Sequence, residues 1–437
     1  MNENRRNILK AATLAAGGAG LISTHRAWAG ANDRIRIAVM GMGGRGGELM
    51  TFSSKVKGVE VAAICDPDES RMRTWAASME ALSGKRPRTE PDIRRLLDDK
   101  TIDAVVIACC NHWHALAGIW ACQAGKHVYV EKPVSHNLFE GRKLVEAARK
   151  YDRCVQGGIQ NRSNHRIRKA MRLLQEGVIG DVYMARWIIA AHRDSIGFQQ
   201  SEKPPADLHW DLWLGPAPEQ PFHRNLVHYN WHWFWDFGNG EMGNNGTNFM
   251  DVARWGLGVR LPRKVHSIGG RYGYQDQAVT PNTQTTTFEY AEGKMLVCDI
   301  RGVYTGEESG WYFYGSDGSM WMTPGGDFRV YWKTNKSPDS IRSFSKEMDE
   351  GVDPLTTGVI GHLRNFYDSI RTGEWKALRG EIEEMHLSCA LCHLANIAYR
   401  CEAKLAFDPD RETFDRPEAN ALATRQYRKP YVVPEKV

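Results

Sequence analysis

Residues 34–50 read RIRIAVMGMGGRGGELM, and this stretch decides the fold of the N-terminal part of the chain. Its first seven residues begin with alternating apolar side chains and end fully apolar, as a strand does when it enters a buried parallel sheet. The loop that follows has the pattern G-x-G-x-x-G, and GELMTFSSK then reads as a helix. A glycine loop between a strand and a helix is typical of a dinucleotide-binding unit.

The spacing of the loop has a physical reason. Gly41 permits a tight turn, Gly43 lets the backbone approach a pyrophosphate, and Gly46 lets helix and strand pack closely. A second strand, VEVAAICD, ends in Asp66, whose carboxylate can accept hydrogen bonds from both ribose hydroxyls and repels the 2′-phosphate of NADP. The sequence therefore predicts NAD as the cofactor, held by a loop that also contains Met42 and Arg45.

Strand and helix patterns continue to alternate up to about residue 155. DAVVIACC and HVYVEKP read as strands, and HALAGIWACQAG and NLFEGRKLVEAARKY read as helices. This alternation predicts an α/β domain over residues 33–155, with a doubly wound Rossmann sheet of parallel strands. Ligands bind at the carboxyl ends of such strands. Two polar loops are expected there, Asn111 to His114 and Glu131 to Pro133.

Residues 156–437 show a different pattern. VYMARWIIAAHR, KVHSIGGRYGY, TQTTTFEYAEGKMLVCDIRGVY and GWYFYGSDGSMWM read as strands and hairpins. Helical segments follow around GVIGHLRNFYDSIRTG and GEIEEMHLSCALCHLANIAYR, and then a polar tail. We expect a C-terminal α+β domain with a large open, mainly antiparallel sheet, and two domains suit a chain of 437 residues.

Residues 1–29 have the features of an export signal. Arg5 and Arg6 precede a modestly apolar run, and Ala27-Trp28-Ala29 fits a cleavage site. The paired arginines indicate the twin-arginine type, so we expect the twin-arginine export machinery as a partner and a periplasmic location. No later apolar run is long enough for stable membrane insertion. No block of like charges indicates nucleic-acid binding.

The nine cysteines do not predict a disulfide framework, because their number is odd and their spacing irregular. Cys65, Cys109, Cys110 and Cys298 lie in strand-like apolar runs, where a thiol is a small buried hydrophobe. No metal site is expected.

Several of these motifs together resemble the Gfo/Idh/MocA family of oxidoreductases. The resemblance rests on the glycine loop, Asp66, CCNHWH, AGKHVYVEKPVSHN and QGGIQNRS, and it runs from about residue 33 to beyond 430. It implies that Lys132 lies between the nicotinamide and the substrate hydroxyl, with Pro133 helping to fix it. It also implies a carbohydrate substrate, a homo-oligomer formed through the open sheet, and contacts along the cofactor from Glu131, Asn111, His114 and Gln160.

One departure from the family concerns the proton carrier. Many members have an Asp and a His four residues apart where this chain has Asn244 and Asn248, and an amide is no general base near neutral pH. Lys132 could move the proton itself, a neighbour could do so, or the protein could bind its ligand without turnover. The neighbouring candidates are His228, Tyr229 and His232, in an aromatic-rich stretch that could equally be core or stack on a sugar. Asn248 would then contact the substrate.

The sequence thus predicts an NAD-dependent oxidoreductase acting on a hydroxyl of a sugar, polyol or glycoside. Export into a compartment without an NAD pool favours a tightly bound, internally recycled cofactor. Two alternatives remain: a redox-neutral glycosidase that oxidises, eliminates and reduces again, and a non-catalytic sugar-binding protein.

Overall fold

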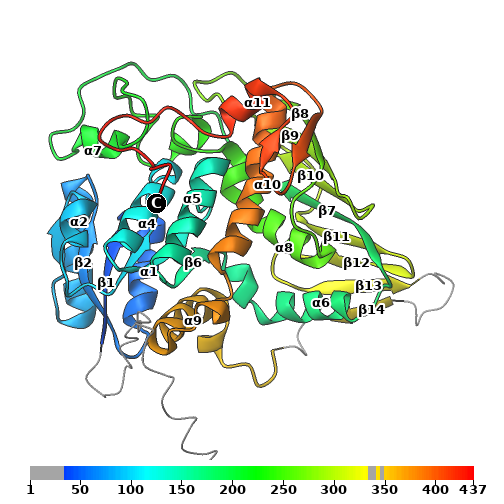
Figure 1. Cartoon of the computed structure of the whole chain (residues 1–437), viewed down its shortest axis with the longest axis horizontal. Coiled ribbons are helices and arrows are strands. Elements are labelled where there is room, and N and C mark those ends of the chain that lie inside the picture. The colour runs from blue at the N-terminus through cyan, green and yellow to red at the C-terminus, as the bar shows by residue number, and fades with distance from the viewer. Residues whose placement is uncertain (1–33, 333–340, 345–348) are drawn as a thin grey trace, which may run out of the picture.

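A computed structural model describes residues 34–332, 341–344 and 349–437 (Figure 1). The export signal expected at residues 1–29 lies outside the described residues. Two sheets lie side by side in this part of the chain (Figure 1). One is built from the N-terminal third of the chain, and the other from its middle together with two strands from near its C-terminus. Of the described helices, none is both long and apolar enough to cross a bilayer.

The first sheet has six parallel strands in the order β3-β2-β1-β4-β5-β6. This arrangement confirms the predicted doubly wound Rossmann domain. Its strands are β1 (Ile35–Met40), β2 (Val59–Cys65), β3 (Arg88–Glu90), β4 (Ala104–Ile107), β5 (His127–Glu131) and β6 (Val155–Gly158). Its helices are α1 (Gly44–Ser54), α2 (Glu69–Ser83), α3 (Ile93–Leu97), α4 (Asn111–Gln123) and α5 (Leu138–Lys150).

The structure corrects the prediction at the end of β4. This strand ends at Ile107, so Cys109 and Cys110 lie in the following loop and not in the strand. Pairing stops because the neighbouring β1 turns away at Gly41 and leaves the chain beyond Ala108 without a partner strand. Asn111 to His114 form the first turn of α4, where a polar loop was expected.

The second sheet has ten strands in the order β14-β13-β12-β11-β7-β10-β9-β8-β15-β16, and only β7 and β10 pair in parallel. The prediction of a mainly antiparallel sheet is confirmed. Its strands are β7 (Val182–Ala190), β8 (Lys264–Gly270), β9 (Thr283–Glu289), β10 (Met295–Arg301), β11 (Gly310–Gly315), β12 (Gly318–Met322), β13 (Phe328–Trp332), β14 (Ile341–Phe344), β15 (Leu405–Asp408) and β16 (Thr413–Phe414).

Helices cover one face of this sheet, and buried and unburied residues therefore alternate along β8 and β9. The remaining α-helices are α6 (His165–Gln175), α7 (Trp210–Leu214), α8 (Thr247–Leu257), α9 (Gly358–Thr372), α10 (Ile382–Arg400) and α11 (Pro417–Leu422). Short 3-10 helices are η2 (Gln160–Ser163), η3 (Asn230–Trp233), η7 (Pro354–Thr356) and η8 (Trp375–Ala377), and η4 (Met242–Gly246) is a π-helix.

The C-terminal elements return to the first domain. Helix α10 lies between α5 and the second sheet, and the tail crosses from α11 back toward α4 (Figure 1). Leu363 and Phe366 of α9 and Met385 of α10 are buried in the core of the first domain, as are Tyr431 and Val433 of the tail. The core of the Rossmann domain therefore includes side chains from beyond residue 155.

Candidate functional site

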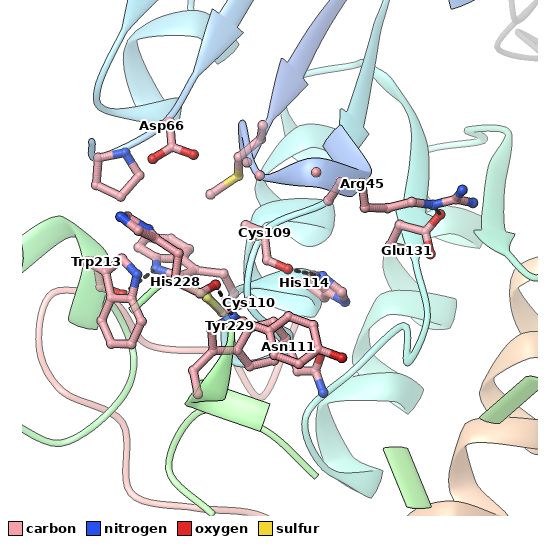
Figure 2. Close-up of a pocket in the computed structure, with 18 of the residues that line it drawn as sticks. Arg45, Asp66, Cys109, Cys110, Asn111, His114, Glu131, Trp213, His228 and Tyr229 are labelled. Atoms are coloured by element: carbon pink, nitrogen blue, oxygen red, sulfur yellow. Dashed lines mark hydrogen bonds and ion pairs between the residues drawn. The ribbon is translucent and has the colours of Figure 1, made fainter. Parts of the chain in front are cut away.

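A pocket of about 470 Å³ lies at the carboxyl ends of the parallel strands (Figure 2). Of the site residues named from the sequence, Met42, Gly46 and Pro133 do not line it. The residues it brings together are Gly41, Gly43, Arg45, Asp66, Asn111, His114, Glu131, Lys132, Gln160, His228, Tyr229, His232 and Asn248. Asp66 and Glu131 lie at its opposite ends (Figure 2).

The glycine loop has the shape that a dinucleotide needs. Gly41 has φ +90°, and a side chain there would lie 2.5 Å from the Cys109 nitrogen. A side chain on Gly46 would lie 1.7 Å from the Gly41 oxygen, so both positions exclude any larger residue. A side chain on Gly43 would meet only Arg71 Nη1, at 3.7 Å, and one on Gly44 would meet nothing within 4 Å; α1 begins at Gly44 without a side-chain cap. Free N–H groups at a helix start bind phosphate well, so the loop fits NAD.

Asp66 closes one end of the pocket, just after β2. Its Oδ2 accepts a hydrogen bond from the Met42 nitrogen at 2.5 Å, and its Oδ1 accepts one from the Asp68 nitrogen at 2.9 Å. Each carboxylate oxygen has a second lone pair for a ribose hydroxyl. Burial raises the pKa of Asp66 to about 6, although both backbone hydrogen bonds favour the charged form. Met42 thus positions Asp66 through its backbone.

At the opposite end, Arg45 connects the glycine loop to β5. Its Nε donates to Glu131 Oε1 at 2.7 Å, and its Nη2 donates to Gln160 Oε1 at 3.2 Å. Glu131 Oε2 in turn accepts from the Lys132 nitrogen at 3.2 Å. This network ties three of the predicted cofactor residues to the backbone of Lys132.

His114 lies between the two ends of the pocket. Its ring nitrogens face the carbonyl oxygens of Pro133 at 2.7 Å and Cys109 at 2.9 Å. Burial lowers the pKa of His114, so its neutral form donates to one of these carbonyls. The ring therefore links the start of α4 to the loop that holds Lys132.

Lys132 points across to the second domain. Its Nζ donates to the backbone oxygen of Asn244 at 2.9 Å. Burial lowers the pKa of Lys132, and the neighbouring Glu131 carboxylate opposes this change. The Asn244 carbonyl belongs to the π-helix η4, and such irregular turns often occur at functional sites. Asn248 lies one turn further on, and its buried Oδ1 has no hydrogen-bond partner within the described chain.

The three candidate proton carriers occupy different places. His228 Nε2 lies 3.1 Å from Asp68 Oδ2, beside Asp66 (Figure 2). Strands lie about 4.8 Å apart, so the ends of β2 and β5 are separated by roughly 14 Å. His228 therefore lies at the Asp66 end of the pocket, and its role as a proton carrier stays a prediction.

His232 lines the same pocket as Lys132, and the Lys132 charge contributes to lowering the pKa of His232. Its Nδ1 lies 2.6 Å from the Tyr229 oxygen, and its ring stacks on Trp231 with centroids 3.6 Å apart. Since a carbonyl only accepts, Nδ1 carries the proton and Nε2 is an acceptor. Burial lowers the pKa of His232 to about 3, so the ring is neutral at pH 7. The Tyr229 hydroxyl lies 3.5 Å from Arg193 Nη1.

A stretch of the second domain, residues 207–234, covers the cofactor half of the pocket, and we name it the roof segment. The Glu69 nitrogen donates to the Asp207 oxygen at 2.9 Å, and the His209 nitrogen donates to the Pro67 oxygen at 2.9 Å. Further along, the Trp113 indole donates to the Leu212 oxygen at 3.1 Å. The sequence did not predict the roof segment, because irregular backbone has no periodic pattern to detect.

The described residues include no group of three or more His, Cys, Asp or Glu side chains suited to a metal ion. All nine cysteines are free thiols. Cys109 and Cys110 line the pocket, and burial raises the pKa of both.

Fold and pocket together define a two-domain protein with a dinucleotide-binding pocket. Family models agree: one described as "Oxidoreductase family, NAD-binding Rossmann fold" matches residues 35–159, and one described as "Oxidoreductase family, C-terminal alpha/beta domain" matches residues 197–433. The chain belongs to the Gfo/Idh/MocA oxidoreductase family, and its first domain binds NAD.

Curated relatives match over part of their length. A glycosyl hydrolase family 109 protein of Solibacter usitatus is 32% identical over 168 residues, which are 35% of this chain and 38% of the relative. Inositol 2-dehydrogenase 2 of Saccharopolyspora erythraea is 32% identical over 163 residues, 37% of this chain and 46% of the relative. The chain thus spans less than half the length of these two relatives.

Solved structures share the fold over most of the chain. The WlbA dehydrogenase of Chromobacterium violaceum, in complex with NADH and UDP-GlcNAcA, has a TM-score of 0.65 at 18% identity, covering 86% of this chain and 96% of that one. A levoglucosan dehydrogenase in complex with NADH and levoglucosan has a TM-score of 0.64 at 18% identity, covering 85% of this chain and 99% of that one.

Proposed function

We propose that this protein is an NAD-dependent oxidoreductase that acts on a hydroxyl of a sugar, polyol or glycoside and keeps its NAD between turnovers, because a carbonyl group, on the oxidised product or on a second sugar, takes the hydride back from the reduced cofactor in each cycle. The observation that carries this proposal is the position of Lys132. Its ammonium lies between the cofactor residues Arg45 and Glu131 and the π-helix that leads to Asn248. A substrate hydroxyl bound there would lie beside both the cofactor and a cation.

The residues have distinct tasks in this mechanism. NAD, when bound, supplies the acceptor for a hydride. The Lys132 ammonium stabilises the negative charge that grows on the substrate oxygen as its proton leaves. The Asn248 Oδ1 accepts a hydrogen bond from another substrate hydroxyl, which would satisfy its orphaned oxygen. The Nε2 of His232 is an unprotonated acceptor near Lys132 and receives the proton.

The roof segment supports retention of the cofactor. It is held to the first domain by backbone hydrogen bonds at Pro67 and Glu69 and by the contact between His228 and Asp68, all beside Asp66. Release of NAD would require these contacts to open. Retention in turn suits export of a folded, loaded protein, and we propose that residues 1–29 direct it to the periplasm through the twin-arginine machinery.

A second candidate function is the redox-neutral cleavage of a glycoside. It is favoured by cofactor retention, since the hydride returns in the same cycle, and by the relatives that carry the glycosyl hydrolase family 109 name. We also propose that the uncovered face of the second sheet forms a homo-oligomer, because unburied residues line one side of β8 and β9.

One experiment separates the two candidate activities from each other and from sugar binding without catalysis. Purified protein with its own nucleotide is mixed with polyols, free sugars and aryl glycosides, while nicotinamide absorbance and products are followed. A dehydrogenase gives an oxidised sugar and one equivalent of reduced cofactor per site. A redox-neutral glycosidase releases the aryl group repeatedly with no net cofactor change. If sugars bind without reduction of the cofactor and without release of the aryl group, the protein is non-catalytic and the main proposal is overturned.

A further inference from the structure

A second cavity, of about 250 Å³, shares no lining residue with the cofactor pocket. It lies where α10, the end of α11 and the tail meet the start of α5 and the loop before η4. Its volume is below the roughly 300 Å³ at which sites for drug-sized ligands begin. The cavity therefore has room for about one sugar ring, and not for a dinucleotide.

Asn396 supplies an unsatisfied polar atom in this cavity. The residue is only 5% exposed, and its Nδ2 donates to the backbone oxygen of Asn239 at 2.9 Å. Because a carbonyl only accepts, this hydrogen bond fixes which side of the amide is nitrogen. The remaining Oδ1 is buried and has no hydrogen-bond partner within the described ranges. Such an orphaned acceptor is costly unless a ligand donates to it.

The cavity also carries positive charge. Arg400 ends α10, and its guanidinium lies 5.2 Å from the Trp235 ring centre. No carboxylate in the described part of the chain forms an ion pair with Arg400. Among the residues that the structure describes, Arg425 bonds only to neutral acceptors, namely His136 Nδ1 at 3.1 Å and the backbone oxygens of Asp236 and Pro216.

Two carboxylates lie near the cavity. The buried Glu140 carboxylate acts electrostatically on Arg425 and accepts hydrogen bonds from the His136 nitrogen and Asn137 Nδ2. Asp236 lines the cavity at its solvent-exposed rim and acts electrostatically on Arg400, while its Oδ2 accepts from Gln220 Nε2 at 3.2 Å. Two guanidinium groups and an orphaned acceptor thus line one cavity, a combination that suits a ligand with both a carboxylate and hydroxyl groups.

We propose that this second cavity binds a polyhydroxylated carboxylic acid of one sugar's size. Its carboxylate binds Arg400 and Arg425, and one of its hydroxyls donates to Asn396 Oδ1. Asn239 connects the two sites, because its own Oδ1 accepts from Asn111 Nδ2 at 3.0 Å and Asn111 lines the cofactor pocket. The proposal does not depend on the reaction catalysed in the first pocket.

Calorimetry on the NAD-loaded protein tests this inference, with D-galacturonate as the acid and D-galactose as its neutral counterpart. We expect the acid to bind at least tenfold more tightly than galactose. Arg400→Met, which keeps most of the stem at an exposed position, should weaken acid binding at least tenfold, and Arg400→Lys should recover part of it. Arg411→Met removes an exposed arginine elsewhere on the surface and should leave the affinity for the acid unchanged. Crystals soaked in galacturonate should show it in the second cavity.

Three results would overturn the proposal. One is the absence of binding at millimolar galacturonate in the wild type. Another is equal affinity in the wild type and Arg400→Met. The third is acid binding that is lost in Asn248→Ala but retained in Arg400→Met, because this places the acid in the first pocket.

Discussion

The Lys132 ammonium donates a 2.9 Å hydrogen bond to the backbone oxygen of Asn244, a residue 112 positions away in the other domain. This bond places the cation where the Rossmann domain meets the π-helix of the second domain. Because the acceptor is a backbone oxygen, substitution of the Asn244 side chain does not remove it. The position of the Lys132 ammonium therefore depends on the backbone of the π-helix. The first prediction concerns this lysine.

Lys132→Met keeps the side-chain stem and removes the charge. We expect turnover to fall by about 100-fold or more, because loss of one group that stabilises a growing negative charge typically costs that much, while the NAD content of the purified protein stays near that of the wild type. Steady-state kinetics and nucleotide quantification give both values. Lys143→Met, at a lysine paired with Glu146 on α5, is the matched control. More than half of wild-type turnover in Lys132→Met would exclude a catalytic role.

Asp66 should set the choice of cofactor. Its carboxylate favours a free 2′-hydroxyl, so protein stripped of nucleotide should bind NAD more than tenfold more tightly than NADP, a difference above ~1.4 kcal/mol. Asp66→Ser should reduce the ratio of NAD affinity to NADP affinity. Calorimetry with both nucleotides measures it, and equal affinities in the wild type would contradict the assignment.

The same carboxylate should make NAD binding depend on pH. The pKa of Asp66 is raised to about 6, above its ordinary value near 4, so it gains its proton as the pH falls through 6. The protonated form loses acceptors for the ribose, and NAD affinity should therefore fall below about pH 6 and level off above pH 7. The NAD affinity of Asp66→Asn should not change with pH over this range. A wild-type affinity that stays constant between pH 5 and 7 would argue against this role.

Substitutions of His228 and of His232 should have different effects. His228→Asn breaks the contact with Asp68, so it should speed NAD release and leave the pH–rate profile unchanged. His232→Gln should remove a limb of that profile. Since the pKa of His232 is lowered to about 3, a His232 base stays active down to about pH 4, whereas an ordinary imidazole protonates near 6.5. A profile that is unchanged in His228, Tyr229 and His232 variants would leave Lys132 as the proton carrier.

The protein should be purified with NAD already bound. A residence time of roughly an hour, at association rates of about 10⁵ to 10⁷ M⁻¹s⁻¹, implies a dissociation constant in or below the nanomolar range. Mass spectrometry after denaturation detects the nucleotide. Cys109 and Cys110 line the pocket, so bound NAD should also protect them from alkylation, and stripped protein should lose this protection. Protein that is isolated empty and binds NAD with micromolar affinity would disprove retention.

The features that could be predicted from the sequence are those that periodic patterns and turn residues determine. The strand before Gly41, the position of Asp66 and the hairpins of the second sheet follow local rules that operate within a few residues. It did not separate His228 from His232, because only the path of the roof segment brings one beside Asp68 and the other near Lys132. The packing of α9 on the first domain was missed for the same reason: it depends on contacts between residues far apart in the chain.

The return of the tail to the first domain affects the timing of folding during synthesis. Tyr431 and Val433 are buried among residues of the Rossmann core, yet they emerge from the ribosome roughly 270 residues after β6. At about 5 to 20 residues per second, translation leaves the N-terminal domain incomplete for roughly 15 to 55 seconds. During this interval its exposed apolar surface is a target for chaperones. Capture of NAD by the nascent glycine loop would stabilise the unfinished domain until the tail arrives.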